Sequence, residues 1–89
     1  MKYKSGRETS VATAGVVLTS SDFDFEAFTY FSIFVDGDAT VEIWQGAYGS
    51  TIRLNANTGF DREMSGTRLR IKAVTGTINT NWYVDSQLD

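Results

Sequence analysis

Residues 28–45 read FTYFSIFVDGDATVEIWQ, and this stretch decides the fold. It contains two runs rich in β-branched and aromatic residues, 28–35 and 40–45, separated by Asp-Gly-Asp at residues 36–38. Such residues favour β-strands, and a short connection that contains glycine is typical of an antiparallel hairpin. The stretch therefore predicts a hairpin in which Gly37 supplies the positive φ of a tight turn.

The first of these runs is largely apolar on both of its faces. Side chains alternate along a strand, so the odd-numbered residues from Phe31 to Val35 share one face. The other face carries Phe28, Tyr30 and Phe34. One sandwich core covers only one face of an outer sheet, so the second face needs another cover. We therefore expect Phe28, Tyr30 and Phe34 to contact a second copy of the chain in a homo-oligomer.

Alternation continues on the C-terminal side of this stretch. In residues 67–75, apolar side chains that face the core alternate with Arg68, Arg70 and Lys72, which face outward. In residues 77–84, every second residue from Ile78 onward is expected on one face. The other segments with strand character are residues 11–19 (with or without a break at Gly15), 22–26, 50–54 and 60–64.

Seven or eight short antiparallel strands result, and no window shows the apolar spacing of a helix. Two sheets packed face to face are the arrangement that this pattern favours, with a small β-barrel as the alternative. We expect a flexible basic arm over residues 1–8, a single β-sandwich domain over residues 9–85 and a short polar tail over residues 86–89. The residues of the arm that are candidates for docking on an acidic surface are Lys2, Tyr3, Lys4 and Arg7.

The 89 residues include no Cys, no His and no Pro. These absences exclude a disulfide framework, thiolate and imidazole metal sites, and a Ser-His-Asp triad. A Ser or Thr nucleophile would need Lys or a carboxylate as its base, and no glycine-rich nucleotide motif is present. We therefore expect no enzymatic activity, no catalytic residue and no cofactor.

The formal net charge is −3, and three of the eight basic residues lie in the first seven positions. The rest of the chain is strongly acidic, which disfavours nucleic acid as a partner. The longest run that is mostly apolar, residues 28–35, is too short to span a bilayer, and no apolar segment of a signal peptide follows the basic start. These features predict a protein made in the cytosol, without a membrane partner.

Two groups of carboxylates are candidates for chemistry. Asp22, Asp24 and Glu26 would share one face of an extended strand, where they could serve glycoside hydrolysis or bind Ca²⁺. Asp36 and Asp38 could contribute oxygen ligands to Ca²⁺, but the further ligands of an EF-hand loop are absent. A solvated face for the first group and an ordinary turn for the second are the favoured interpretations, so no metal site is expected.

Exposed aromatic rings could bind a ligand by stacking, as they do in many carbohydrate-binding β-sandwiches. The candidates are Trp44, Tyr48 and Trp82, with Tyr83 beside them. Packing in the core or in a subunit interface is the favoured interpretation of these residues. Glycan binding through Trp44, Tyr48 and Trp82 remains the alternative function.

A second surface candidate is the basic stripe formed by Arg68, Arg70 and Lys72, with Arg53 as a further candidate on an adjacent strand. Outward charges protect a sheet from aggregation and pair across strands, which is the favoured interpretation. An electrostatic contact between subunits is the second choice for this stripe.

Two stretches together resemble a known group of proteins. Residues 31–45 (FSIFVDGDATVEIWQ) and residues 65–77 (SGTRLRIKAVTGT) are similar to strands of small β-sandwich structural proteins of tailed bacteriophage virions. That group includes head decoration or cement proteins and modules of head fibres and tails. The resemblance implies a non-enzymatic viral structural protein, often trimeric, that is made in the host cytoplasm and attached in the virion to the capsid or to another virion protein.

Overall fold

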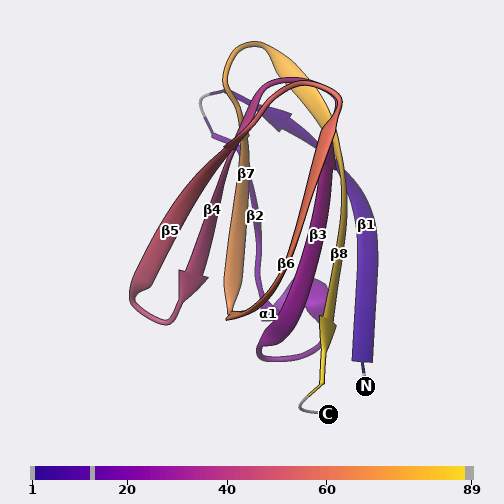
Figure 1. Ribbon diagram of the computed structural model, residues 1–89, viewed down its shortest axis with the longest axis vertical. Helices are drawn as coiled ribbons and strands as arrows, with labels where there is room; N and C mark the ends of the chain where they lie inside the picture. Colours follow the sequence, from indigo (N-terminus) through magenta and orange to yellow (C-terminus); the bar gives the residue numbers. More distant parts are fainter. Residues whose placement is uncertain (1, 13, 88–89) are drawn as a thin grey trace.

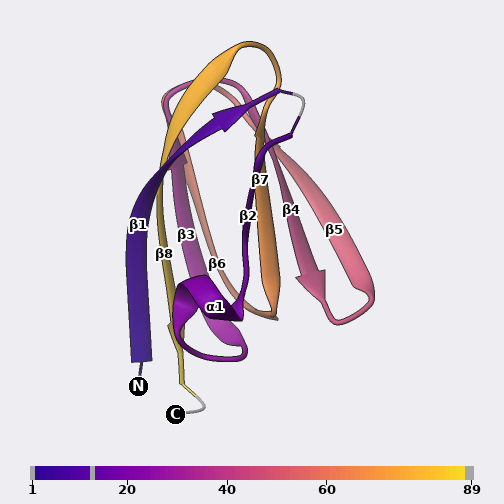
Figure 2. The same cartoon turned by 180° about the vertical axis from the view of Figure 1, so that it is seen from behind.

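The computed structural model describes residues 2–12 and 14–87, which form two four-stranded antiparallel sheets packed as a sandwich (Figures 1 and 2). One sheet has the order β1-β8-β3-β6 and the other has the order β2-β7-β4-β5. The first sheet consists of β1 (Lys2–Val11), β8 (Thr77–Ser86), β3 (Phe28–Val35) and β6 (Thr58–Gly66). The second consists of β2 (Val16–Leu18), β7 (Arg68–Ala73), β4 (Ala39–Gln45) and β5 (Tyr48–Leu54). The prediction of an all-β sandwich is confirmed, and the described strands do not close into a barrel.

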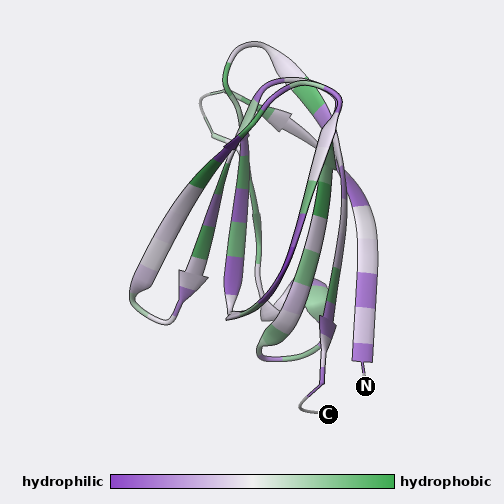
Figure 3. Ribbon diagram, viewed as in Figure 1, coloured by the Kyte–Doolittle hydropathy of each residue, from purple (hydrophilic) through white to green (hydrophobic). Residues whose placement is uncertain are grey.

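The alternation that predicted the inner faces is confirmed in β7 and β8. Figure 3 shows hydrophilic and hydrophobic bands in turn along β7. Its Leu69, Ile71 and Ala73 are all buried, as are the alternate residues of β8 from Ile78 to Val84. The core lies between the two layers and takes side chains from both sheets.

Residues 36–38 do not form the hairpin that the sequence predicts. β3 and β4 belong to different sheets, so the chain crosses here from one layer to the other. Val35 and Ala39, on either side of the crossing, are both fully buried. Gly37 does not have a positive φ either. A Cβ at this position would overlap Cγ2 of Ile78. A glycine is therefore required because there is no room for a side chain, and not because of the backbone conformation.

The flexible arm expected over residues 1–8 is instead part of a strand over its described residues. β1 pairs with β8 from Lys2, opposite Ser86, to Val11, opposite Thr77. Gly6 lies against the Trp82 ring, and a Cβ there would come within 2.7 Å of Trp82 Cζ2. β1 is an edge strand that is held largely by backbone hydrogen bonds to β8. Its side chains are therefore mostly polar, and the apolar alternation that would predict a strand is absent.

The C-terminal tail expected over residues 86–89 differs as well. Ser86 is buried and is the last residue of β8, and residues 88–89 lie outside the described part of the chain.

The chain between β1 and β3 agrees with the prediction at Gly15 and departs from it at residues 22–26. Strand structure over residues 11–19 is broken around Gly15, which is one of the two predicted alternatives, and β2 covers only Val16–Leu18. A single helical turn that the sequence did not predict, α1 (Ser20–Phe23), follows. Asp22 accepts a hydrogen bond from the backbone N–H of Thr19 at 2.8 Å, and Asp24 ends the turn in the left-handed conformation with φ of 67°. The turn places Phe23 in the core with no exposed surface.

Phe28 lies in the core and not on the outer face that the alternation predicts. The pairing of β3 with β6 shifts register between Phe28 and Tyr30, so the two residues do not share a face. Phe28 is fully buried, with its ring centroid 5.8 Å from that of Phe23 and 5.9 Å from that of Phe31. Phe28 is therefore removed from the candidate subunit interface.

Candidate functional site

The outer face of the sheet β1-β8-β3-β6 gathers aromatic rings and carboxylates from all four strands. Residues that are directly paired in an antiparallel sheet share a face, and Phe31, Ile33 and Val84 point into the core. The alternate positions in the same strands therefore point outward. The outer set, which we call the tyrosine face, consists of Tyr3, Arg7, Tyr30, Phe34, Asp61, Glu63, Tyr83 and Asp85.

Three tyrosines form a continuous row across this face. Tyr83 lies between the other two: its ring centroid is 6.1 Å from Tyr3, with nearly stacked planes, and 6.1 Å from Tyr30, with an edge-to-face arrangement. Tyr3 is 67% exposed, and Phe34 is 45% exposed on the same face. The rings thus present aromatic surface to the solvent although the core beneath is already filled.

Carboxylates hold two of these tyrosines in place. The Tyr30 hydroxyl donates to Asp61 Oδ2 at 3.1 Å, and the Tyr83 hydroxyl donates to Asp85 Oδ2 at 3.0 Å. Partial burial, followed by these hydrogen bonds, raises the pKa of both tyrosines above its ordinary value of 10.0. The two hydroxyls therefore stay protonated and remain donors to the carboxylates at neutral pH.

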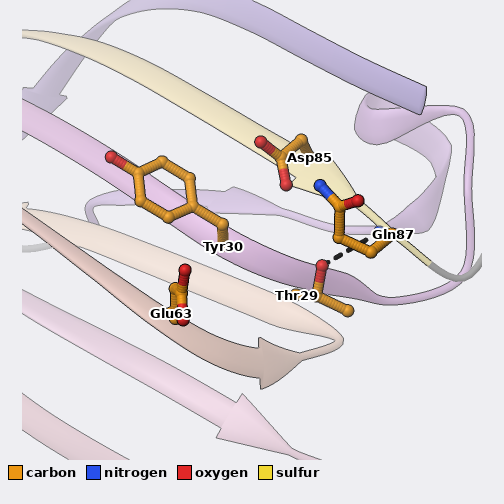
Figure 4. A pocket seen from close by; sticks show the side chains of 5 residues that line it. All are labelled: Thr29, Tyr30, Glu63, Asp85 and Gln87. Atoms are coloured by element: carbon orange, nitrogen blue, oxygen red, sulfur yellow. Dashed lines mark hydrogen bonds between the residues drawn. The ribbon is translucent and has the colours of Figure 1, made fainter. Parts of the chain in front are cut away.

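A hollow of about 390 Å³ opens at one end of the tyrosine face (Figure 4). Its lining residues are Thr29, Tyr30, Glu63, Asp85 and Gln87. The backbone N–H of Gln87 donates to Thr29 Oγ1 at 3.0 Å and closes one side. Asp85 is only 8% exposed, and its Oδ1 is buried without a hydrogen-bond partner among the described residues. The hollow thus presents carboxylates, which favour a ligand that carries positive charge or hydrogen-bond donors.

The outer face of the other sheet has the opposite character. Arg68, Arg70 and Lys72 of β7 pair with Trp44, Glu42 and Thr40 of β4, and Arg53 of β5 also pairs with Thr40. The set that we call the basic face consists of Glu42, Trp44, Arg53, Arg68, Arg70 and Lys72. The outward direction predicted for the cations of β7 agrees with the burial of the alternate residues.

Aromatic and ionic contacts order the basic face. The guanidinium carbon of Arg68 lies 4.1 Å from the Trp44 ring centroid, and that of Arg70 lies 5.8 Å away. Arg70 also pairs with Glu42, with 2.6 Å between Nη2 and Oε1. Stacking on tryptophan limits the freedom of Arg68 and leaves its charge exposed.

The three aromatic residues of the alternative ligand site have unlike environments. Trp82 is 6% exposed and packs in the core, with its ring centroid 6.0 Å from that of Phe23. Trp44 is half-buried beneath Arg68, and Tyr48 is 82% exposed at the start of β5. Trp82 therefore offers no exposed ring, and these residues do not form one stacking platform.

Three of the carboxylates considered for metal binding, those of Asp22, Asp36 and Asp38, accept hydrogen bonds from backbone N–H groups. Asp22 caps α1 and Asp24 ends it, so with Glu26 they do not share a strand face. Asp36 accepts from the backbone N–H of Asn79 at 2.7 Å, and Asp38 accepts from that of Ala56 at 2.8 Å. Among the described residues, no group of three or more Asp, Glu, His or Cys could hold a metal ion.

The residues expected in a docking arm are spread over different surroundings. Lys4 pairs with Asp24 at 3.0 Å, whereas Tyr3 and Arg7 belong to the tyrosine face. Sequence reasoning missed Asp61, Glu63 and Asp85 as site residues. Their alternation within β6 and β8 indicates that they share one face of their strands. It does not predict that they lie near Tyr30, which depends on the register in which β6 and β8 pair with β3.

In the described part of the chain, no helix is long and apolar enough to cross a membrane. Comparisons with known proteins found no matching family, no similar curated protein and no similar solved structure. The geometry of the two outer faces is therefore the basis for a functional proposal.

Proposed function

We propose that this chain is a non-enzymatic structural protein that self-associates through the tyrosine face, of the kind built into tailed-phage particles. The observation that carries the proposal is the row of Tyr3, Tyr83 and Tyr30, with exposed Phe34 nearby, on a sheet face that the core does not use. Tyrosine and phenylalanine are enriched in protein interfaces, where their burial contributes much of the binding energy.

Further properties support a structural role. The rings of Tyr30 and Tyr83 are held by hydrogen bonds, so they lose little freedom when a partner covers them. The chain contains no His and no Cys for the commonest catalytic arrangements. The acidic side chains of the face favour a protein partner over nucleic acid. The resemblance of residues 31–45 and 65–77 to phage structural proteins supports placement in a virion, on a capsid or on another virion protein.

Sedimentation velocity over a range of concentrations tests the proposal. We expect the wild-type protein to associate, and the double variant Tyr3→Ser/Phe34→Ser to remain monomeric with an unchanged circular dichroism spectrum. Val74→Ser is the matched control, because Val74 is also exposed but lies in the turn after β7. The proposal would be overturned if the wild-type protein stayed monomeric up to about 100 μM, because a dissociation constant above that concentration is too weak for a stable assembly. Association that the double variant leaves unchanged would also overturn it.

Glycan binding is a second candidate function, and one observation favours it. The tyrosine rings lie beside the carboxylates of Asp61, Glu63 and Asp85, which combine stacking surfaces with acceptors for sugar hydroxyls. Titration of ¹⁵N-labelled protein with soluble polysaccharides tests it by NMR. Chemical-shift changes confined to Tyr3, Tyr30 and Tyr83 in a monomeric protein would support glycan binding, and unchanged spectra would exclude the glycans tested.

A further inference from the structure

The two outer faces of the sandwich carry opposite charge. On the tyrosine face, three carboxylates (Asp61, Glu63 and Asp85) accompany one cation, Arg7. On the basic face, four cations accompany one carboxylate, Glu42, which is paired with Arg70, and Asp38 at the edge of the face lies 4.0 Å from Arg53. Arg68 and Lys72 are the cations of this face that form no ion pair among the described residues. The faces belong to different sheets and lie on opposite sides of the same core.

We propose that self-association is head-to-tail, with the basic face of one copy docked on the tyrosine face of the next. This inference rests on the proposed function, which requires only that the tyrosine face makes a contact. If that face met its own counterpart in a second copy, Asp61 and Glu63 would meet a surface that is also acidic, which costs binding energy. Contact with the basic face instead pairs opposite charges and suppresses the like-charged arrangement.

The hollow beside Tyr30 supplies the specific contact. Glu63 and Asp85 line it, and neither carboxylate forms an ion pair among the described residues. A guanidinium group binds carboxylates through paired, charge-assisted hydrogen bonds and also stacks on aromatic rings. Arg68 of a second copy suits this hollow because it is exposed and is already ordered on Trp44. Its insertion beside Tyr30 would place the charge next to both carboxylates.

Head-to-tail contact also determines the symmetry of the assembly. The two docked surfaces differ, so each added copy leaves one face of each kind free. The series of contacts ends only where a ring closes, and otherwise it continues as an open stack. A dimer with one shared, self-complementary patch is not compatible with this contact.

Charge reversal on each face tests the inference. An acid-reversed variant carries Asp61→Lys/Glu63→Lys, and a base-reversed variant carries Arg68→Glu/Lys72→Glu. The substituted side chains are exposed or half-buried and lie outside the core, and Asp85 and Arg70 are retained. We expect each variant alone to be monomeric, because both of its faces then have the same sign. An equimolar mixture should associate again, since every contact can pair unlike faces.

The control is Glu8→Lys/Glu26→Lys, which changes the net charge by the same amount as the acid-reversed variant does. Its substitutions lie outside the tyrosine face, so it should associate like wild type. The decisive sample is the base-reversed variant. If it associates normally while the acid-reversed variant does not, the tyrosine face meets another surface, so head-to-tail docking is wrong and the proposed function stands. If wild type itself is monomeric, both proposals fail. Raising the salt concentration should weaken association in wild type and in the mixture, because exposed charges are screened.

Discussion

At the scale of single residues, two glycines make room for core aromatic rings. Gly66 pairs with Phe28, and a Cβ at Gly66 would come within 2.8 Å of Phe28 Cε1. Gly6 pairs with Trp82, and a Cβ at Gly6 would come within 2.7 Å of Trp82 Cζ2. Neither glycine has a positive φ, so each is required because a ring of the neighbouring strand occupies the place of a side chain.

Gly66→Ala should therefore destabilise the fold. The added methyl group has to displace the Phe28 ring, which is fully buried, and overpacking of this kind costs about 1–3 kcal/mol. Urea unfolding should show a lower free energy of unfolding for Gly66→Ala. Ser65→Ala, at the exposed neighbouring position of β6, is the control and should be close to wild type. Equal stability of the two variants would contradict the packing described for Phe28.

The stability of the crossing between β3 and β4 (residues 36–38) depends on pH through Asp36. Hydrogen bonds from the backbone and the side chain of Asn79 hold the pKa of Asp36 below its ordinary value of 3.8. The ionised carboxylate therefore stabilises the folded state above about pH 3.8, and this contribution is lost as the pH falls through the lowered pKa.

Asp36→Asn should reduce this acid sensitivity. We expect the variant to be less stable than wild type at pH 7, and the difference between the two proteins to shrink towards pH 3, where the carboxylate begins to take up a proton. Urea midpoints measured at several pH values compare them. If the difference in stability between the two proteins stayed constant over this pH range, the carboxylate charge of Asp36 would not stabilise the crossing.

At the scale of elements, β1 is the strand that the composition conceals. Lys2, Lys4 and Arg7 make the segment basic and polar, as in a flexible arm. Its pairing with β8 nevertheless extends over ten residue pairs, and it contributes Tyr3 to the tyrosine face. This pairing depends on the free edge of β8, which lies far away in the sequence. The pattern of residues 2–8 alone therefore cannot predict it.

Deletion of residues 2–7 should therefore destabilise the domain itself. The deletion removes ladder hydrogen bonds to β8 and uncovers Trp82, and each lost backbone hydrogen bond contributes about 0.5–1.5 kcal/mol. We expect urea unfolding to show a free energy of unfolding that is lower by several kcal/mol, and the tryptophan fluorescence, to which Trp44 and Trp82 both contribute, to shift to longer wavelength. Full retention of stability in the truncated protein would show that the segment behaves as the flexible arm that its composition suggests.

At the scale of the whole molecule, the crossing between β3 and β4 creates two unlike outer faces. It sends two consecutive strands to different sheets, so the tyrosines of β1, β3 and β8 collect on one side and the cations of β5 and β7 on the other. In the hairpin that the sequence predicts, β3 and β4 would lie in one sheet, and Trp44 would lie on the same face as Tyr30 and Phe34. The separation of the faces, and with it the possibility of head-to-tail docking, is a property of the tertiary structure.

The sequence by itself determined the all-β class, the extent of β3 and the inner faces of β7 and β8. These follow from alternation, which depends only on the two-residue period of a strand. Only the tertiary structure decided that β1 is a strand, that Phe28 turns inward and that Tyr3, Tyr30 and Tyr83 meet. Each of these depends on which strand lies beside which and in what register. Backbone hydrogen bonds and core packing between residues far apart in the chain determine that pairing, and no local period encodes it.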